Sequence, residues 1–66
     1  MKILYIEKKP HWIIVYCLND KGMLGSIPMY RQGEWCAGIY EYVPSITNYI
    51  RDIKKELKIL EERGEL

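Results

Sequence analysis

The stretch PSITNYIRDIKKELKILEER, residues 44–63, changes the hydrophobic period of the chain from alternation to the spacing of a helix. Its apolar residues recur at intervals of four, three, four and three, which places them on one stripe of an amphipathic helix. They are Ile46, Ile50, Ile53, Leu57 and Leu60. Ser45 is a suitable N-cap, and Arg63-Gly64 provides a cationic last turn and a C-cap. The stretch therefore predicts a helix over residues 46–63.

The sequence before this helix is typical of short β-strands separated by turns. Residues 11–18 (HWIIVYCL) form a run without polar alternation, which predicts a central strand covered on both faces. The turn Asn19-Asp20-Lys21-Gly22 follows, and Gly25 with Pro28 places the next strand at a sheet edge. Ala37-Gly38 indicates a bulge or a close approach in the last strand. The four predicted strands cover residues 2–7, 11–18, 23–30 and 35–43.

These elements predict one α+β domain over residues 1–66, a small antiparallel four-stranded β-meander with one C-terminal helix. A chain of this length buries only about 60% of its unfolded surface. One helix covers one sheet face, so the other face is left with aromatic and aliphatic residues. Two solutions remain open, a curled SH3-like barrel and the stacking of two copies.

Composition and charge favour self-association over a charged partner. Hydrophobic residues make up 48% of the chain and its net charge is +1. This hydrophobic share is high for so small an interior, and it predicts a homodimer or a large partner surface. The small net charge gives no overall electrostatic field that would attract nucleic acid or a membrane. We expect no signal peptide and no membrane segment, and therefore a cytoplasmic protein, in the host cytoplasm if it is viral.

The chemistry-bearing residues do not combine into a catalytic or metal site. The chain has a single histidine, His11, which lies six residues from Cys17 on one predicted strand, roughly 20 Å away at about 3.3 Å per residue. Cys36 can approach only one of the two. The acidic residues are dispersed, and no glycine-rich phosphate loop precedes a helix. We therefore expect a protein without enzymatic activity, cofactor or metal, with both cysteines reduced and packed as small apolar residues.

The favoured function is a small protein–protein interaction module, an inhibitor or adaptor that covers part of a larger macromolecule. Chains of this size without catalytic residues are typical of accessory proteins of viruses and mobile elements, including inhibitors of host defence. Exposed aromatic residues are expected to carry the binding, because Trp and Tyr dominate interface energies. These are Trp35, Tyr40 and Tyr42, followed by Trp12 and Tyr30. The alternative for either Trp is a place in the core under the helix.

A basic stripe on the helix supports a second hypothesis. Residues at positions i, i+3, i+4 and i+7 lie on one side of a helix, and here they are Arg51, Lys54, Lys55 and Lys58. Such a stripe is suited to nucleic-acid phosphates. Neighbouring carboxylates make a solvated mixed-charge face the other interpretation. A structural subunit of a larger assembly is a third hypothesis.

Overall fold

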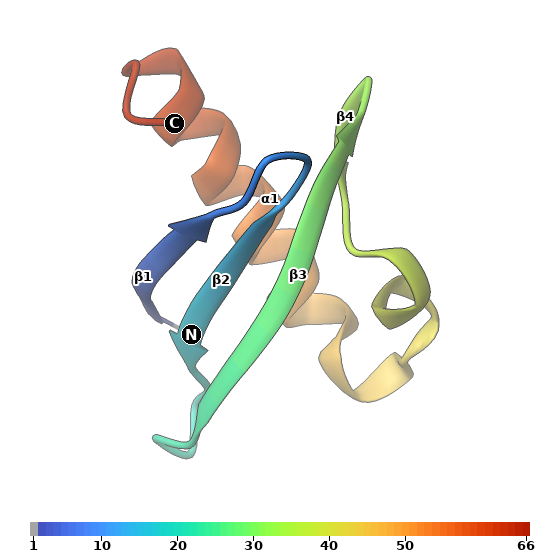
Figure 1. Ribbon diagram of the computed structural model, residues 1–66. Helices are drawn as coiled ribbons and strands as arrows, with labels where there is room; N and C mark the ends of the chain where they lie inside the picture. Colours follow the sequence, from blue (N-terminus) through green and yellow to red (C-terminus); the bar gives the residue numbers. More distant parts are fainter. Residues whose placement is uncertain (1) are drawn as a thin grey trace.

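The computed structural model describes residues 2–66 and shows four strands followed by helical segments (Figure 1). The strands are β1 (Lys2–Lys8), β2 (Ile13–Leu18), β3 (Leu24–Gln32) and β4 (Glu34–Cys36). Two short 3₁₀-helices lead into one α-helix: η1 (Gly38–Tyr42), η2 (Pro44–Ile46) and α1 (Thr47–Glu62). All strand pairs are antiparallel, in the order β1-β2-β3-β4. The predicted α+β meander with one C-terminal helix is confirmed.

The molecule has two layers, because α1 packs on one face of the sheet and leaves the other face open (Figure 1). Alternate residues of β2, Ile13, Val15 and Cys17, are buried under the helix. The residues between them are only half-buried. The prediction that this strand is covered on both faces is therefore wrong, since one helix covers only one face. The buried core consists of Ile13, Val15, Cys17, Ile27, Met29, Ala37, Ile50, Ile53 and Leu57.

β3 lies between β2 and β4 in the sheet, but no residue of β3 pairs with both of them. It pairs with β2 from Leu24 to Met29, and with β4 only from Tyr30 to Gln32. The segment Leu24–Met29 therefore forms an edge of the sheet, as Gly25 and Pro28 predict. The rest of the strand is paired on its other side by β4.

The predicted fourth strand over residues 35–43 ends at Cys36. Gly38 adopts a φ of +60°, which residues with a side chain rarely adopt, and there the chain turns away from the sheet into η1. A Cβ at Gly38 would lie 3.0 Å from the hydroxyl of Tyr30. The expected bulge is thus the point at which the chain leaves the sheet. Within residues 2–66 no ladder joins β1 to β4, so the sheet is open and the SH3-like barrel is not formed.

The sequence predicts the C-terminal end of α1 correctly but not its N-terminal cap. Ser45 does not cap the helix, because it belongs to η2, and α1 begins after Ile46 without a side-chain cap. At the other end, Gly64 has a φ of +74° and its N–H donates to the carbonyl of Glu61 at 3.0 Å. The N–H of Glu65 donates to the carbonyl of Leu60 at 2.8 Å, which completes a Schellman motif. The predicted C-terminal stop is confirmed.

Candidate protein interface

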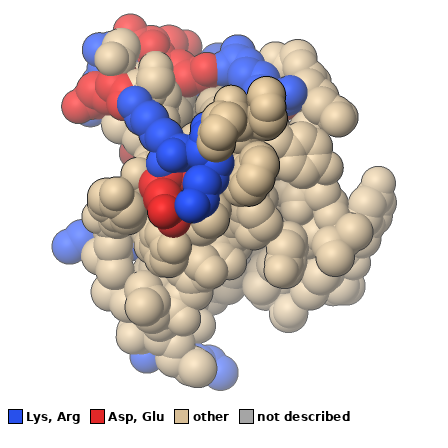
Figure 2. Space-filling model, viewed as in Figure 1, with Lys and Arg blue, Asp and Glu red and all other residues tan. Residues whose placement is uncertain are grey.

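The sheet surface opposite α1 carries mainly aromatic and aliphatic side chains. Directly paired residues of antiparallel strands share a face, so the register of β1, β2 and β3 defines this surface, which we call the open face. Its members are Lys2, Tyr5, Glu7, Ile14, Tyr16, Leu18, Leu24, Ser26 and Pro28. Figure 2 shows that uncharged side chains occupy most of the surface seen from this side. No described element packs across it.

A small polar network orients the aromatic residues of the open face. The hydroxyl of Tyr16 donates to Oε1 of Glu7 at 3.2 Å, and Nζ of Lys9 lies 3.1 Å from the other carboxylate oxygen. The ring centroids of Tyr16 and Tyr5 are 5.9 Å apart. Hydrogen bonds from Lys9 and Tyr16 lower the pKa of Glu7, and the bond to Glu7 raises the pKa of Tyr16. The negative charge on this surface is therefore neutralised locally by a lysine.

Two of the five predicted partner-binding residues lie on or beside the open face. Trp12 immediately precedes β2 and has the same parity as Ile14 and Tyr16, and it is 42% exposed. Tyr30 lies two residues after Pro28 in β3, so its side chain is on the same side of the sheet as the open face, and it is half-buried beside Gly38. Trp12 is thus available to a partner, whereas Tyr30 is partly occupied by the protein's own η1 segment.

Tyr40 and Tyr42 lie away from the sheet, on η1. The predicted strand over residues 35–43 would have placed both on one face, but the chain is helical from Gly38 to Tyr42 and does not alternate its side chains across two faces. Tyr42 is 85% exposed, and Tyr40 is at the margin of exposure at 37%. They belong to a separate exposed surface together with Ile39.

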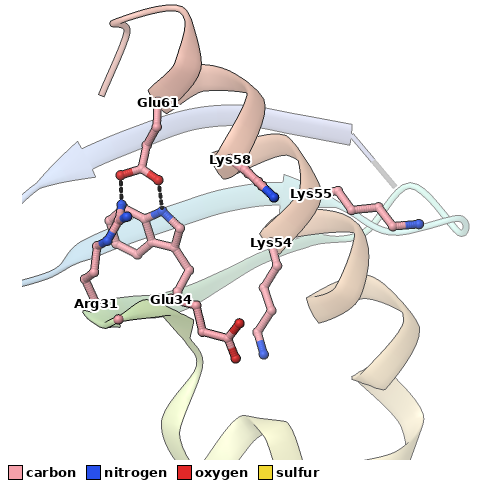
Figure 3. A pocket seen from close by; sticks show the side chains of 8 residues that line it. Arg31, Glu34, Lys54, Lys55, Lys58 and Glu61 are labelled. Atoms are coloured by element: carbon pink, nitrogen blue, oxygen red, sulfur yellow. Dashed lines mark hydrogen bonds and ion pairs between the residues drawn. The ribbon is translucent and has the colours of Figure 1, made fainter.

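Trp35 has a structural environment between β4 and α1. Its Nε1 donates to Oε1 of Glu61 at 3.0 Å, and the guanidinium of Arg31 lies 5.5 Å from its ring centroid. Arg31 also forms an ion pair with Glu61, so one carboxylate joins both residues to the helix (Figure 3). Trp35 is half-buried and packs against the core. This arrangement corresponds to the alternative of a Trp under the helix.

The basic stripe of α1 is interrupted by carboxylates. A hollow of about 370 Å³ lies between α1 and the β3–β4 turn (Figure 3). It is lined by Arg31, Gly33, Glu34, Trp35, Lys54, Lys55, Lys58 and Glu61. Lys54 is paired with Glu41, which raises the pKa of that lysine. Arg51 lines a second hollow beside Glu41. Carboxylates of Glu34, Glu41 and Glu61 thus lie among the four basic residues of the stripe.

The two cysteines differ in accessibility. Cys17 is buried, and burial raises the pKa of its thiol. Cys36 is half-buried, and its Sγ lies 3.5 Å from the carbonyl oxygen of Glu34. Both are free thiols, and across residues 2–66 no cluster of three or more His, Cys, Asp or Glu side chains is placed to hold a metal ion.

We expect Cys36 to react with an aromatic disulfide reagent roughly tenfold or more faster than Cys17, because the thiolate is the reactive form and must be accessible. The rates are measured on the Cys17→Ala and Cys36→Ala variants at neutral pH. In denaturant the two thiols should react at similar rates. Faster reaction of Cys17 in the folded protein would contradict the burial described above.

The sequence concealed the importance of Tyr5 and Tyr16. Every residue from Trp12 to Leu18 is apolar or aromatic, so the run does not reveal which alternate set faces the helix. The signal that remains is the polar character of Tyr itself, which suits a half-wet position. The paired position of Tyr5 and Tyr16 depends on the β1–β2 register, which shifts between Ile3 and Tyr5.

Comparison with family models, with curated proteins and with solved structures finds no match to this chain. Among the described residues no helix is long and apolar enough to cross a membrane.

Proposed function

We propose that the protein is a non-enzymatic interaction module, an inhibitor or adaptor that binds another protein through its open face. The observation that carries this proposal is the uncovered sheet surface built around Tyr5, Ile14 and Tyr16. Contiguous apolar surface of this kind marks interaction sites on small soluble proteins. Trp12 lies at its border and is large, rigid and exposed, as expected of an interface anchor.

The chemistry of the open face favours a protein partner over a polyanion. Its one carboxylate among the described residues, Glu7, is paired with Lys9 beside the face, and its other charged member, Lys2, lies opposite Leu18 at the end of β1. The aromatic residues present both ring surface and hydroxyl groups, a combination enriched at the centre of protein interfaces. The partner should therefore offer an apolar surface with few uncompensated charges.

A capture experiment with matched charge substitutions tests this proposal. Ile14→Lys places a charge within the open face, and Ile39→Lys places the same charge on η1, where the side chain is 77% exposed. We expect a stoichiometric protein to be captured from the native cells by the wild type and by Ile39→Lys, with and without nuclease, but not by Ile14→Lys. Capture that is lost after nuclease treatment, or retained by Ile14→Lys, would overturn the proposal.

The open face also supports the predicted homodimer. Without a partner, two copies can cover each other's open faces by stacking their sheets. Light scattering after size exclusion at micromolar concentration should give twice the chain mass of 7.9 kDa. Ile14→Lys should return the mass to that of one chain. A wild-type mass of one chain at every concentration would exclude the homodimer.

The nucleic-acid hypothesis leads to a separate prediction for α1. Lys55→Glu with Lys58→Glu reverses two exposed charges of the stripe and leaves the Lys54–Glu41 pair intact. We expect this double variant to bind the protein partner as the wild type does. If the stripe binds phosphates instead, affinity for an oligonucleotide should fall steeply with salt and the variant should abolish it. Gel shifts across a salt series distinguish the two results.

A further inference from the structure

The edge of β3 opposite β2 is free over Leu24–Pro28. β4 pairs with β3 only beyond this segment, from Tyr30 onward. The N–H of Asn19 donates to the carbonyl of Met23 at 3.0 Å, so Asn19 and Met23 are a hydrogen-bonded pair. Hydrogen-bonded and non-hydrogen-bonded pairs alternate along an antiparallel ladder, so the backbone groups of the odd-numbered residues of β3 in this region bond to β2. The backbone groups of Leu24 and Ser26 therefore point away from β2. Pro28 has the same parity, and its missing N–H would also have pointed outward.

This free edge has one of the usual protections against strand addition, Pro28 at one end, and lacks the others. Natural edge strands are ordinarily protected by charged residues, by proline, by bulges or by a covering element. Residues 22–30 (GMLGSIPMY) contain no charged side chain. Leu24, Gly25 and Ser26 are all exposed, Leu24 to 68%. Within residues 2–66 no backbone hydrogen bond other than those to β2 engages this segment.

An apolar hollow of about 260 Å³ adjoins the free edge. Its lining includes Cys17, Ile27, Tyr40, Ile46 and Tyr49, which come from β2, β3, η1, η2 and α1. Gly25 also lines it, and a Cβ at that position would find no atom within 4 Å. The missing side chain of Gly25 thus leaves space on the helix side of the sheet.

We infer that the free edge of β3 binds an extended, uncharged segment of another protein as a fifth strand, with one apolar side chain of that segment inserted into the hollow. The backbone of the segment bonds to the N–H and C=O groups of Leu24 and Ser26 and to the carbonyl of Pro28. Successive side chains of a strand point to opposite faces, so one enters the hollow and its neighbours extend the open face. This edge shares Leu24, Ser26 and Pro28 with the open face, but it engages their outward backbone groups and the hollow rather than the side chains of the face.

A second copy of the chain does not meet these requirements. Antiparallel pairing of two β3 edges about Ser26 would place Gly25 of one copy opposite Ile27 of the other. Gly25 has no side chain, and Ile27 is 8% exposed because it belongs to its own core, so neither can fill the hollow. Such pairing would also place Pro28 of each copy opposite Leu24 of the other, so one N–H donor would be missing at each end of the paired segment. In this register a second copy leaves the hollow empty, and the inference commits to a strand of different sequence as the occupant.

Selection from a phage library of random dodecapeptides against the full chain tests this inference. We expect enrichment of uncharged peptides in which apolar residues alternate. Ser26→Pro removes an outward N–H, and Gly25→Val fills the hollow at a position whose φ is not in the left-handed region. Both variants should weaken binding of a selected peptide at least tenfold while circular dichroism stays unchanged. Ser26→Ala, the matched control, should bind as the wild type does.

Amide hydrogen exchange supplies an independent measurement on the wild type. In the free protein the N–H of Ser26 should exchange faster than that of Ile27, which bonds toward β2. Adding the selected peptide should slow exchange at Leu24 and Ser26. Absence of enrichment, equal binding to Ser26→Pro and Gly25→Val, or unchanged exchange at Ser26 would overturn the inference. Ile14→Lys should still bind the peptide, so failure of the open-face proposal is distinguishable from failure of this one.

Discussion

Leu57→Ala is expected to lower the free energy of unfolding by about 2–5 kcal/mol, the usual cost of a cavity at a fully buried leucine. Leu57 is 0% exposed and lies on the helix stripe that covers the sheet. A domain of this size has a total stability of roughly 3–10 kcal/mol at ~0.05–0.15 kcal/mol per residue. The loss is therefore a large share of the total, and a substantial unfolded fraction should appear without denaturant.

Urea unfolding followed by circular dichroism measures this effect, and Ile59→Ala is its matched control. Ile59 lies on the same helix but is 39% exposed, so its truncation leaves no enclosed cavity. We expect a loss below about 1 kcal/mol for Ile59→Ala. Equal losses for the two variants would mean that α1 does not pack on the sheet through Leu57.

The helix was predictable because its signal is local and periodic. Of the five residues of the predicted stripe, Ile50, Ile53 and Leu57 are buried and Ile46 and Leu60 are half-buried. The Asn19–Gly22 turn was equally readable, because Asn19 Oδ1 accepts hydrogen bonds from the N–H groups of Lys21 and Met23, both at 2.9 Å. Signals of this kind need only a few neighbouring residues.

The last strand was not predictable to the same degree, because strand pairing is not local. Residues 39–43 have a β-type composition, yet they find no neighbouring strand once Gly38 redirects the chain. Ile39 and Tyr42 are consequently exposed rather than set in a ladder. A composition favourable to strands indicates what a segment can do, not whether a partner strand is present.

The interface residues were only partly predictable for a related reason. Counting one helix against a sheet was sufficient to predict an uncovered face. Assigning side chains to that face required the register of β1 on β2, and it required the contact of Trp35 with Glu61, 26 residues away in sequence. The exposed Trp12 and the structural Trp35 look alike in the sequence, because neither the strand register nor the contact with Glu61 produces a local sequence pattern.

The two tryptophans should therefore give opposite results on replacement by alanine. Trp35→Ala removes the hydrogen bond to Glu61 and the ring beneath Arg31 and should lower the free energy of unfolding by about 2 kcal/mol or more. The ion pair between Arg31 and Glu61 then remains as the only described side-chain link at that position. Affinity of the remaining folded protein for the partner should be unchanged.

Trp12→Ala should leave the unfolding midpoint in place and weaken partner binding about 30-fold, which corresponds to about 2 kcal/mol. Trp12 lies outside the core and is exposed at the border of the open face, so its truncation opens no cavity and removes only partner contact. Calorimetric titration of the captured partner and urea unfolding of each variant provide the two readouts. Loss of stability in Trp12→Ala would place this side chain in the fold. Normal binding and normal stability would move the interface away from this end of the sheet, toward the exposed surface formed by Ile39 and Tyr42.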